Sequence, residues 1–93
     1  MSVVARFHPT GMTTDQYEEA KRRVEENEGK FPPDGMDYHV CFGSDGDLRV
    51  SEIWDSQEEF DGFVQRLRPI LTDVGIQLSD GPEVFEVHSV VKR

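Results

Sequence analysis

The chain has 93 residues, of which 19 are acidic and 10 are basic, so its formal net charge at pH 7 is −9. This charge argues against a nucleic-acid backbone or an anionic membrane surface as the partner, because both attract clustered Lys and Arg. A single cysteine, Cys41, excludes an internal disulfide, and no apolar run reaches the length of a membrane span. With no export signal at its start, the sequence predicts a single cytoplasmic domain over residues 1–93.

The first half of the chain predicts a strand, a helix and a second strand. Val3–His8 is short and rich in β-branched residues. Thr13 with Gln16 three residues later is typical of a capping box, and Gly29 is a suitable helix end. Asp37–Phe42 then reads as the second strand.

Asp45-Gly46 is the strongest hairpin signal in the sequence and predicts a two-residue type I′ turn into a third strand, Leu48–Trp54. A loop of this length fixes which residues face each other across the hairpin. The expected pairs are Cys41 with Val50, His39 with Glu52, and Asp37 with Trp54.

The clearest helix begins at Ser56, which forms a second capping box with Glu59. Pro69 predicts a kink near Gln65–Leu67 or a break into two helices, and Gly75 marks the end. The apolar residues follow helical spacing without a miss: Phe60, Phe63, Val64, Leu67, Ile70, Leu71 and Val74.

A turn at residues 79–82 and a last strand at Val84–Val91 complete the order β-α-β-β-α-β. Two right-handed crossovers then give an antiparallel sheet of order 4-1-3-2 with both helices on one face. The predicted fold class is therefore α+β, ferredoxin-like, and one face of its sheet is free of helices.

Alternation along each strand divides its side chains between the two faces. In each strand the more apolar set is expected beneath the helices, which gives Tyr38, Val40, Phe42 and Ile53 in the hairpin, Val3, Ala5 and Phe7 in the first strand, and Phe85, Val87 and Val91 in the last. The helix-free face is then expected to carry a mixture of apolar and ionisable groups: Arg6, His8, His39, Cys41, Val50, Glu52, Trp54, Glu86, His88 and Val90. Such a face is too apolar to leave in water, which predicts a homodimer that covers it and encloses a cleft.

His39 opposite Glu52 has two interpretations. The carboxylate could orient His39 as a general base, or the two could be a cross-strand pair that satisfies two polar groups. His88 could likewise be a cleft acid or base, or an ordinary strand histidine.

Two of the other expected cleft residues, Trp54 and Arg6, also have two interpretations each. Trp54 could stack on a flat ligand or anchor the dimer. Arg6 could hold a ligand carboxylate or pair with a glutamate, and Val50 would line the cleft. His39 and Cys41 lack further ligands at a metal-site spacing, so Cys41 is read as a small buried residue and no metal is expected.

In the stretch Val50–Phe60, a Glu-x-aromatic motif at a strand end leads directly into a capped helix. This stretch and the order of elements resemble the dimeric α/β-barrel superfamily, in particular the antibiotic-biosynthesis-monooxygenase-like proteins. The resemblance implies a barrel between paired sheets that can hold an aromatic substrate or haem, with Glu52 and Trp54 lining it. Active relatives often carry a histidine on the following helix. This chain has Val64 there, which can neither ligate iron nor transfer a proton.

The sequence therefore supports two hypotheses. In the first, a homodimer binds an apolar or aromatic small molecule and, if catalytic, performs proton transfer or oxygenation without a cofactor, with His39 or His88 as base, Glu52 as orienting group, and Trp54, Arg6, Cys41 and Val50 lining the site. In the second, the protein is a non-catalytic dimeric module whose cleft residues complete the interface. Whether the chain is an enzyme stays open at this point.

Overall fold

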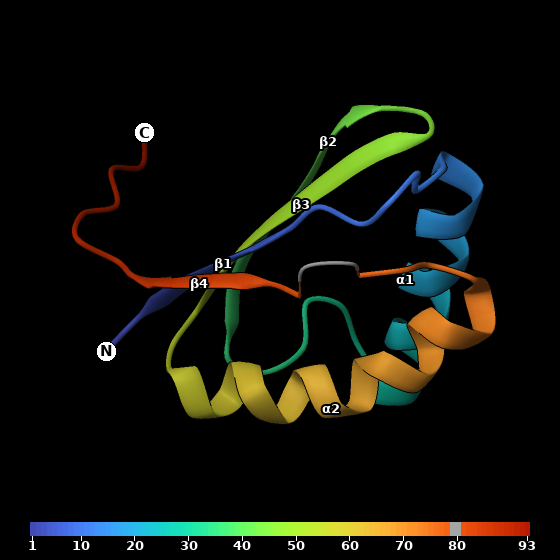
Figure 1. The fold of residues 1–93 in the computed structure, drawn as a ribbon. Helices are drawn as coiled ribbons and strands as arrows, with labels where there is room; N and C mark the ends of the chain where they lie inside the picture. The colour runs from blue at the N-terminus through green and yellow to red at the C-terminus, as the bar shows by residue number, and fades with distance from the viewer. Residues whose placement is uncertain (79–80) are drawn as a thin grey trace.

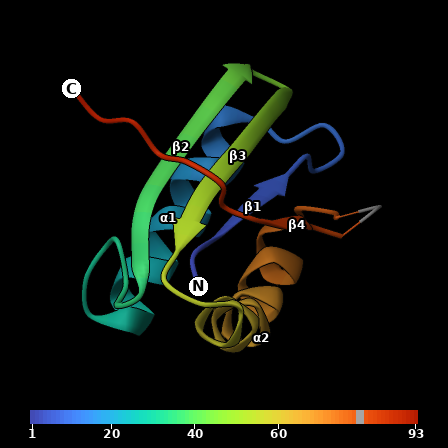
Figure 2. The same cartoon turned by 90° about the vertical axis from the view of Figure 1, so that its left-hand side faces the viewer.

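The computed structural model describes residues 1–78 and 81–93, and within them shows four strands and two helices in the predicted order (Figure 1). The strands form one antiparallel sheet of order β2-β3-β1-β4, which is the predicted order read from the other edge. Both helices lie on the same face of this sheet (Figure 2). The predicted α+β ferredoxin-like fold is confirmed. The elements are β1 (Val3–Phe7), α1 (Thr14–Glu28), β2 (Met36–Ser44), β3 (Asp47–Trp54), α2 (Gln57–Val74) and β4 (Glu83–Glu86).

The helix ends are where the capping residues placed them. The Thr13 side chain accepts from the backbone N–H of Gln16, whose own side chain accepts from the Thr13 N–H, so the first capping box is complete. Ser56 accepts a backbone hydrogen bond at the start of α2. Gly29 and Gly75 end the two helices with φ values of 84° and 86°, a region that glycine enters without steric cost.

The hairpin has the predicted two-residue loop, but its turn differs from type I′. Ser44 pairs with Asp47, and only Gly46 in the loop has a positive φ, whereas type I′ requires one at Asp45 as well. The pairs His39–Glu52 and Cys41–Val50 are confirmed. The third expected pair is wrong, because an irregularity between residues 36 and 38 sets Met36 opposite Trp54.

Two further local expectations differ from the structure. α2 continues through Pro69 as one helix, so the break into two helices is wrong. β4 ends at Glu86, five residues before the predicted end at Val91. The predicted turn at residues 79–82 includes two residues that lie outside the described part of the chain.

The faces of the hairpin are the reverse of the prediction. β1 pairs with β3 so that Val3, Ala5 and Phe7 lie opposite Trp54, Glu52 and Val50, and residues opposite each other share a face. All six are buried beneath the helices. His39 and Cys41 share that face through their pairing with Glu52 and Val50. The helix-free face instead carries the set predicted to lie beneath the helices: Tyr38, Val40, Phe42 and Ile53.

β4 is also reversed. Phe85 pairs with Val4 on the helix-free face and is 52% exposed, while Glu86 pairs with Val3 on the other side. His88 and Val90 lie beyond the strand and are exposed. Of the residues predicted for the helix-free face, the structure places Arg6 there, opposite Ser51 and Glu83.

The core lies between the sheet and the helices. Trp54 is fully buried, with its ring 5.0 Å from that of Phe63 and 6.0 Å from that of Phe60, both on α2. These contacts tie the end of β3 to the first turns of α2. Trp54 is therefore a core residue, neither exposed on the helix-free face nor available to a partner across it.

The segment after β4 runs across the helix-free face in Figure 2. The Val87 N–H donates to the Ser2 carbonyl at 3.0 Å, and Lys92 Nζ lies 3.3 Å from an Asp37 carboxylate oxygen near the start of β2. Between these anchors the segment remains exposed, with Val91 at 92%.

Candidate functional site

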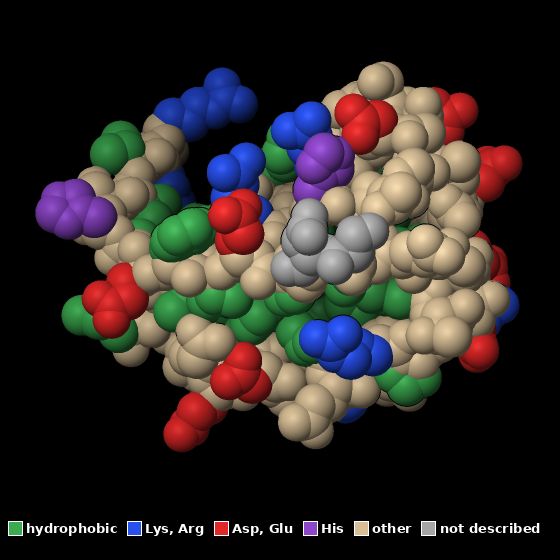
Figure 3. Space-filling model, viewed as in Figure 1, with side chains coloured by type: hydrophobic (Ala, Val, Ile, Leu, Met, Phe, Trp, Pro, Cys, Tyr) green, Lys and Arg blue, Asp and Glu red, His purple; other side chains and the backbone are tan. Residues whose placement is uncertain are grey.

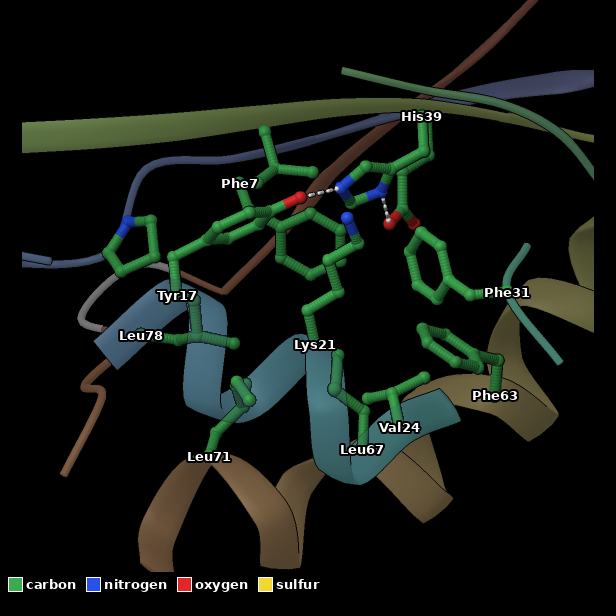
Figure 4. A pocket seen from close by; sticks show the side chains of 14 residues that line it. Phe7, Tyr17, Lys21, Val24, Phe31, His39, Phe63, Leu67, Leu71 and Leu78 are labelled. Atoms are coloured by element: carbon green, nitrogen blue, oxygen red, sulfur yellow. Dashed lines mark hydrogen bonds and ion pairs between the residues drawn. The ribbon is translucent and has the colours of Figure 1, made fainter. Parts of the chain in front are cut away.

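A small cavity of about 70 Å³ lies inside the protomer, between the sheet and the two helices (Figure 4). Its surface is almost wholly apolar, with a few polar side chains at the sheet end. The side chains that surround it come from all the layers of the fold: Phe7, Pro9, Tyr17, Ala20, Lys21, Val24, Phe31, His39, Val50, Glu52, Phe63, Leu67, Leu71 and Leu78. The site therefore lies on the opposite side of the sheet from the cleft that the sequence predicted.

A chain of hydrogen bonds borders this cavity. Tyr17 Oη is 2.7 Å from His39 Nε2, and His39 Nδ1 is 2.8 Å from Glu52 Oε2. The other Glu52 oxygen accepts from Trp54 Nε1 at 3.0 Å. Residues from α1, β2 and β3 thus form one continuous network, the relay, defined as Tyr17, His39, Glu52 and Trp54.

The donor and acceptor properties of these groups set the direction of the relay. Indole Nε1 is a donor only, and a carboxylate accepts only, so Glu52 receives hydrogen bonds from both Trp54 and the Nδ1–H of His39. With Nδ1 protonated, Nε2 carries the lone pair and accepts a hydrogen bond from the Tyr17 hydroxyl. Glu52 therefore fixes the tautomer of His39, and Tyr17 covers its basic nitrogen.

Burial explains why this network has to be complete. Glu52 is 3% exposed, and it is the only buried charged side chain among the described residues. An ionised group without partners at such a depth is strongly unfavourable. Here both carboxylate oxygens are bonded, and no described buried side-chain polar atom lacks a partner.

Ring contacts hold His39 in place. The Tyr17 ring stacks on the imidazole at 5.9 Å between centroids, and Phe31 meets it edge-on at 5.0 Å. Burial raises the pKa of Tyr17 well above its ordinary value of 10.0, with nearby acidic groups adding to the effect. Tyr17 is therefore a neutral phenol at physiological pH and a donor to His39.

Three of the residues expected to form the site do border the cavity: His39, Glu52 and Val50. Trp54 reaches it only through its hydrogen bond to Glu52. Cys41 is partly buried against the core, and burial raises the pKa of its thiol, so it is held as the neutral thiol. Arg6 and His88 are exposed and lie away from the cavity.

The sequence analysis missed three residues that complete the site: Tyr17, Lys21 and Phe31. Tyr17 lies at helical spacing with Ala20 and Val24, which indicates a core position, and a buried tyrosine brings a hydroxyl that needs a partner. Lys21 and Phe31 carry no distinguishing signal in the sequence. Lys21 is one of many charged residues of α1, and the loop that carries Phe31 is positioned by tertiary packing.

The described residues suggest neither a metal centre nor a membrane span. No group of three His, Cys, Asp or Glu side chains within residues 1–78 and 81–93 is arranged to hold a metal ion. In the same part of the chain, no helix has the length and apolar character to cross a bilayer.

Comparison with known proteins gives a clear result for the fold. No family model matches the sequence, and no curated protein matches it. Among solved structures, SnoaB from Streptomyces nogalater, a cofactor-independent oxygenase, matches with a TM-score of 0.62 and 15% identity over 99% of this chain and 96% of its own. The chain has the fold of the antibiotic-biosynthesis-monooxygenase-like proteins.

Two further structures support this assignment of the fold. A candidate antibiotic biosynthesis monooxygenase from Deinococcus radiodurans matches with a TM-score of 0.59 and 11% identity, over 100% of this chain and 98% of its own. Another from Chloroflexus aurantiacus matches with a TM-score of 0.57 and 13% identity, over 98% and 95%. The resemblance read from Val50–Phe60 is thus confirmed at the level of the fold.

Proposed function

We propose that the protein binds a small aromatic molecule in the internal cavity and oxygenates it without a cofactor, after removing a proton from it. The observation that carries this proposal is the relay at the polar end of an otherwise apolar cavity. Apolar walls with a few convergent polar groups are typical of small-molecule sites. The fold shared with the oxygenase SnoaB supports the choice of oxygenation over other proton-transfer reactions.

In this proposal His39 is the general base, and Tyr17 passes the proton to it. An acidic C–H or O–H of the substrate donates to Tyr17 Oη while the Tyr17 proton moves to His39 Nε2, over the observed 2.7 Å. The imidazolium that results is stabilised by Glu52 at 2.8 Å. Because the pKa of Tyr17 is raised, the transfer avoids a free tyrosinate and the two proton movements are coupled.

The oxygenation step then needs only the substrate anion and dioxygen. The anion of an activated aromatic methylene gives one electron to dioxygen, and the resulting radical and superoxide combine into a carbon–oxygen bond. The peroxide takes up the proton held by the relay. Loss of water then leaves a carbonyl, so one methylene and one dioxygen become one carbonyl and one water.

The volume of the cavity limits what enters without movement. An apolar cavity of roughly 150 Å³ holds a benzene ring, and the 70 Å³ found here is less than half of that. Phe31 is only partly buried, lies in the loop between α1 and β2, and packs edge-on against His39. We propose that Phe31 swings outward when a ring enters.

We also propose that the functional unit is a cytoplasmic homodimer formed through the helix-free face. This face exposes Tyr38 at 47%, Phe42 at 39% and Phe85 at 52%. These three aromatic side chains lie on the two edge strands of the sheet, β2 and β4, and their exposure to water is unfavourable, which suits a self-complementary contact across this face. The non-catalytic alternative in its original form is weakened, because Trp54 and Glu52 are buried within the protomer and do not complete this interface.

Oxygen uptake tests the function. The wild-type protein is mixed with anthrone or 2-indanone, each of which has an activated aromatic methylene, in an oxygen electrode, and the uncatalysed rate is subtracted. We expect acceleration with at least one compound, and a loss of about a hundredfold in His39→Gln, the lower end of what a general base contributes. His8→Gln changes an exposed histidine outside the cavity and serves as the control. Equal rates for wild type and His39→Gln, or no acceleration with any compound, would contradict the proposal.

A further inference from the structure

Lys21 stands out among the basic residues of the chain. Of the ten basic side chains, six form ion pairs with carboxylates, namely Arg22, Arg23, Lys30, Arg49, Arg66 and Lys92. The other four, Arg6, Lys21, Arg68 and Arg93, have no ion pair with a carboxylate of residues 1–78 and 81–93, and of these four Lys21 alone is partly buried and borders the cavity.

The position of Lys21 on α1 makes its lack of an ion pair more informative, because two glutamates lie at pairing distance along the helix. Glu18 and Glu25 lie three residues before it and four residues after it, the spacings at which helical ion pairs form. Lys21 also lies four residues after Tyr17 and three before Val24, so it occupies the face of α1 that packs on the core. Its side chain points toward the core and pairs with neither glutamate.

The Lys21 side chain points toward the relay. Figure 4 shows the Lys21 side chain extending from α1 toward His39, between Tyr17 and Phe31. Its Nζ is 5.7 Å from the centre of the Phe31 ring, and Lys21 is partly buried. Among the described residues that border the cavity, it is the only Lys or Arg.

We propose that Lys21 forms an anion subsite in this cavity, so that the ligand is an aromatic ring bearing an anionic oxygen, either a carboxylate or a phenolate. This inference rests on the proposed function and specifies its substrate class. A partly desolvated ammonium gains most from an anionic partner, because its hydration is already reduced. The ring occupies the apolar part of the cavity, and its oxygen pairs with Lys21 beside the Tyr17 hydroxyl.

The arrangement gives Lys21 a positioning function as well. An anionic oxygen held by Lys21 places the ring within reach of Tyr17, the outermost member of the relay. The displacement of Phe31 by a ring would also release the ammonium from its present contact with that side chain. Ligand entry and the pairing of Lys21 are therefore linked.

Binding measured by isothermal titration calorimetry tests this proposal. The probes are benzoate, 4-nitrophenol at mildly alkaline pH, and benzyl alcohol, which matches benzoate in size but is neutral. We expect wild type to bind at least one anion about tenfold more tightly than benzyl alcohol, which is the value of one charged hydrogen bond. Lys21→Met should remove this preference, and Lys21→Arg should retain most of it. The anion that binds more tightly identifies the carboxylate or the phenolate as the natural group.

Lys30→Met is the matched control, because it removes the same charge from an exposed lysine that pairs with Asp34 outside the cavity. It should leave the preference for the anion unchanged. If Lys21→Met binds benzoate and 4-nitrophenolate as tightly as wild type, or if wild type binds all three probes equally, the anion subsite is refuted while the cavity remains a ligand site. If wild type binds none of them, the proposed function fails together with the subsite.

Discussion

The two faces of the same sheet differ in how their side chains are satisfied. On the face beneath the helices, even the buried Glu52 has a partner for each oxygen, and every aromatic ring packs against others. On the helix-free face, Phe85 and Tyr38 are about half exposed and lie among partly buried aliphatic residues. The first face is complete within one protomer, whereas the second gains from a covering partner. We therefore place the proposed chemistry inside the protomer and the proposed dimer contact on the helix-free face.

The surface seen in Figure 3 is consistent with this division. Charged side chains of both signs are dispersed over it, and a band of hydrophobic side chains shows between the strands and α2. Substitutions on the two faces should therefore separate stability and chemistry from assembly. The predictions below run from the largest expected effect to the smallest.

The largest effect is expected from Glu52→Ala. This change leaves the Trp54 and His39 N–H donors buried without acceptors, so we expect the free energy of unfolding to fall by about 3 kcal/mol or more. Urea unfolding at pH 7 measures it. Ser51 precedes Glu52 and points to the opposite face of the sheet, so Ser51→Ala should change the free energy of unfolding by less than about 0.5 kcal/mol. A small effect at Glu52 would show that the relay is not formed.

Phe85→Asp should act on assembly alone. A charge placed in an apolar contact opposes association, so the dissociation constant of the dimer should rise about a hundredfold while the circular dichroism spectrum is retained. Sedimentation velocity over a range of concentrations measures the change. Gln65→Asp adds the same charge to an exposed position of α2 and should leave the dimer intact. A wild-type protein that sediments as a monomer at all concentrations would refute the interface.

Tyr17→Phe removes one hydrogen bond from the relay and should cost about 1 kcal/mol at neutral pH. The folded protein raises the pKa of Tyr17 above that in the unfolded chain, so this contribution is present below pH 10 and is lost as pH rises toward the folded value. Tyrosinate absorbance should show a group that resists ionisation above pH 10 in wild type and is missing in Tyr17→Phe. Ionisation of that group at its ordinary value of 10.0 would contradict the buried position.

The smallest effect is expected at Glu19, on the exposed face of α1. Hydrogen bonds from Arg22 and Arg23 lower the pKa of its carboxyl from 4.5 to about 2. Its contribution to stability is therefore present above pH 4.5 and is lost as pH falls toward 2. Glu19→Gln should flatten the acid side of the stability profile slightly, and solvent screening keeps the change small. An unchanged acid limb in this variant would show that the ion pairs do not persist in solution.

The fold could be predicted from the sequence because its signals are local. Thr13, Ser56, Gly29 and Gly75 mark helix ends through backbone chemistry that depends on few neighbours. The loop at Asp45-Gly46 set the pairing of His39 with Glu52, since loop length alone determines the register.

The faces of the hairpin could not be assigned by apolar content alone. Buried Glu52 made the inner set of β3 look polar, and exposed Phe42 and Tyr38 made the outer set look apolar. The alternation of apolar and polar residues within β3 predicts the faces better, and it agrees with the structure. Leu48, Val50 and Trp54 point inward, and Asp47, Arg49 and Ser51 point outward. The position of the site on the inner face followed from the pairing of β1 with β3, a long-range contact that has no local signal.

The central claim is that ligands bind beneath the helices and not on the helix-free face. Mapping of amide chemical shifts during a benzoate titration tests it most directly. The account predicts that the affected residues cluster around Tyr17, Lys21, His39 and Phe31, with no change at Arg6, Phe42 or Phe85. Shifts confined to the helix-free face would contradict it.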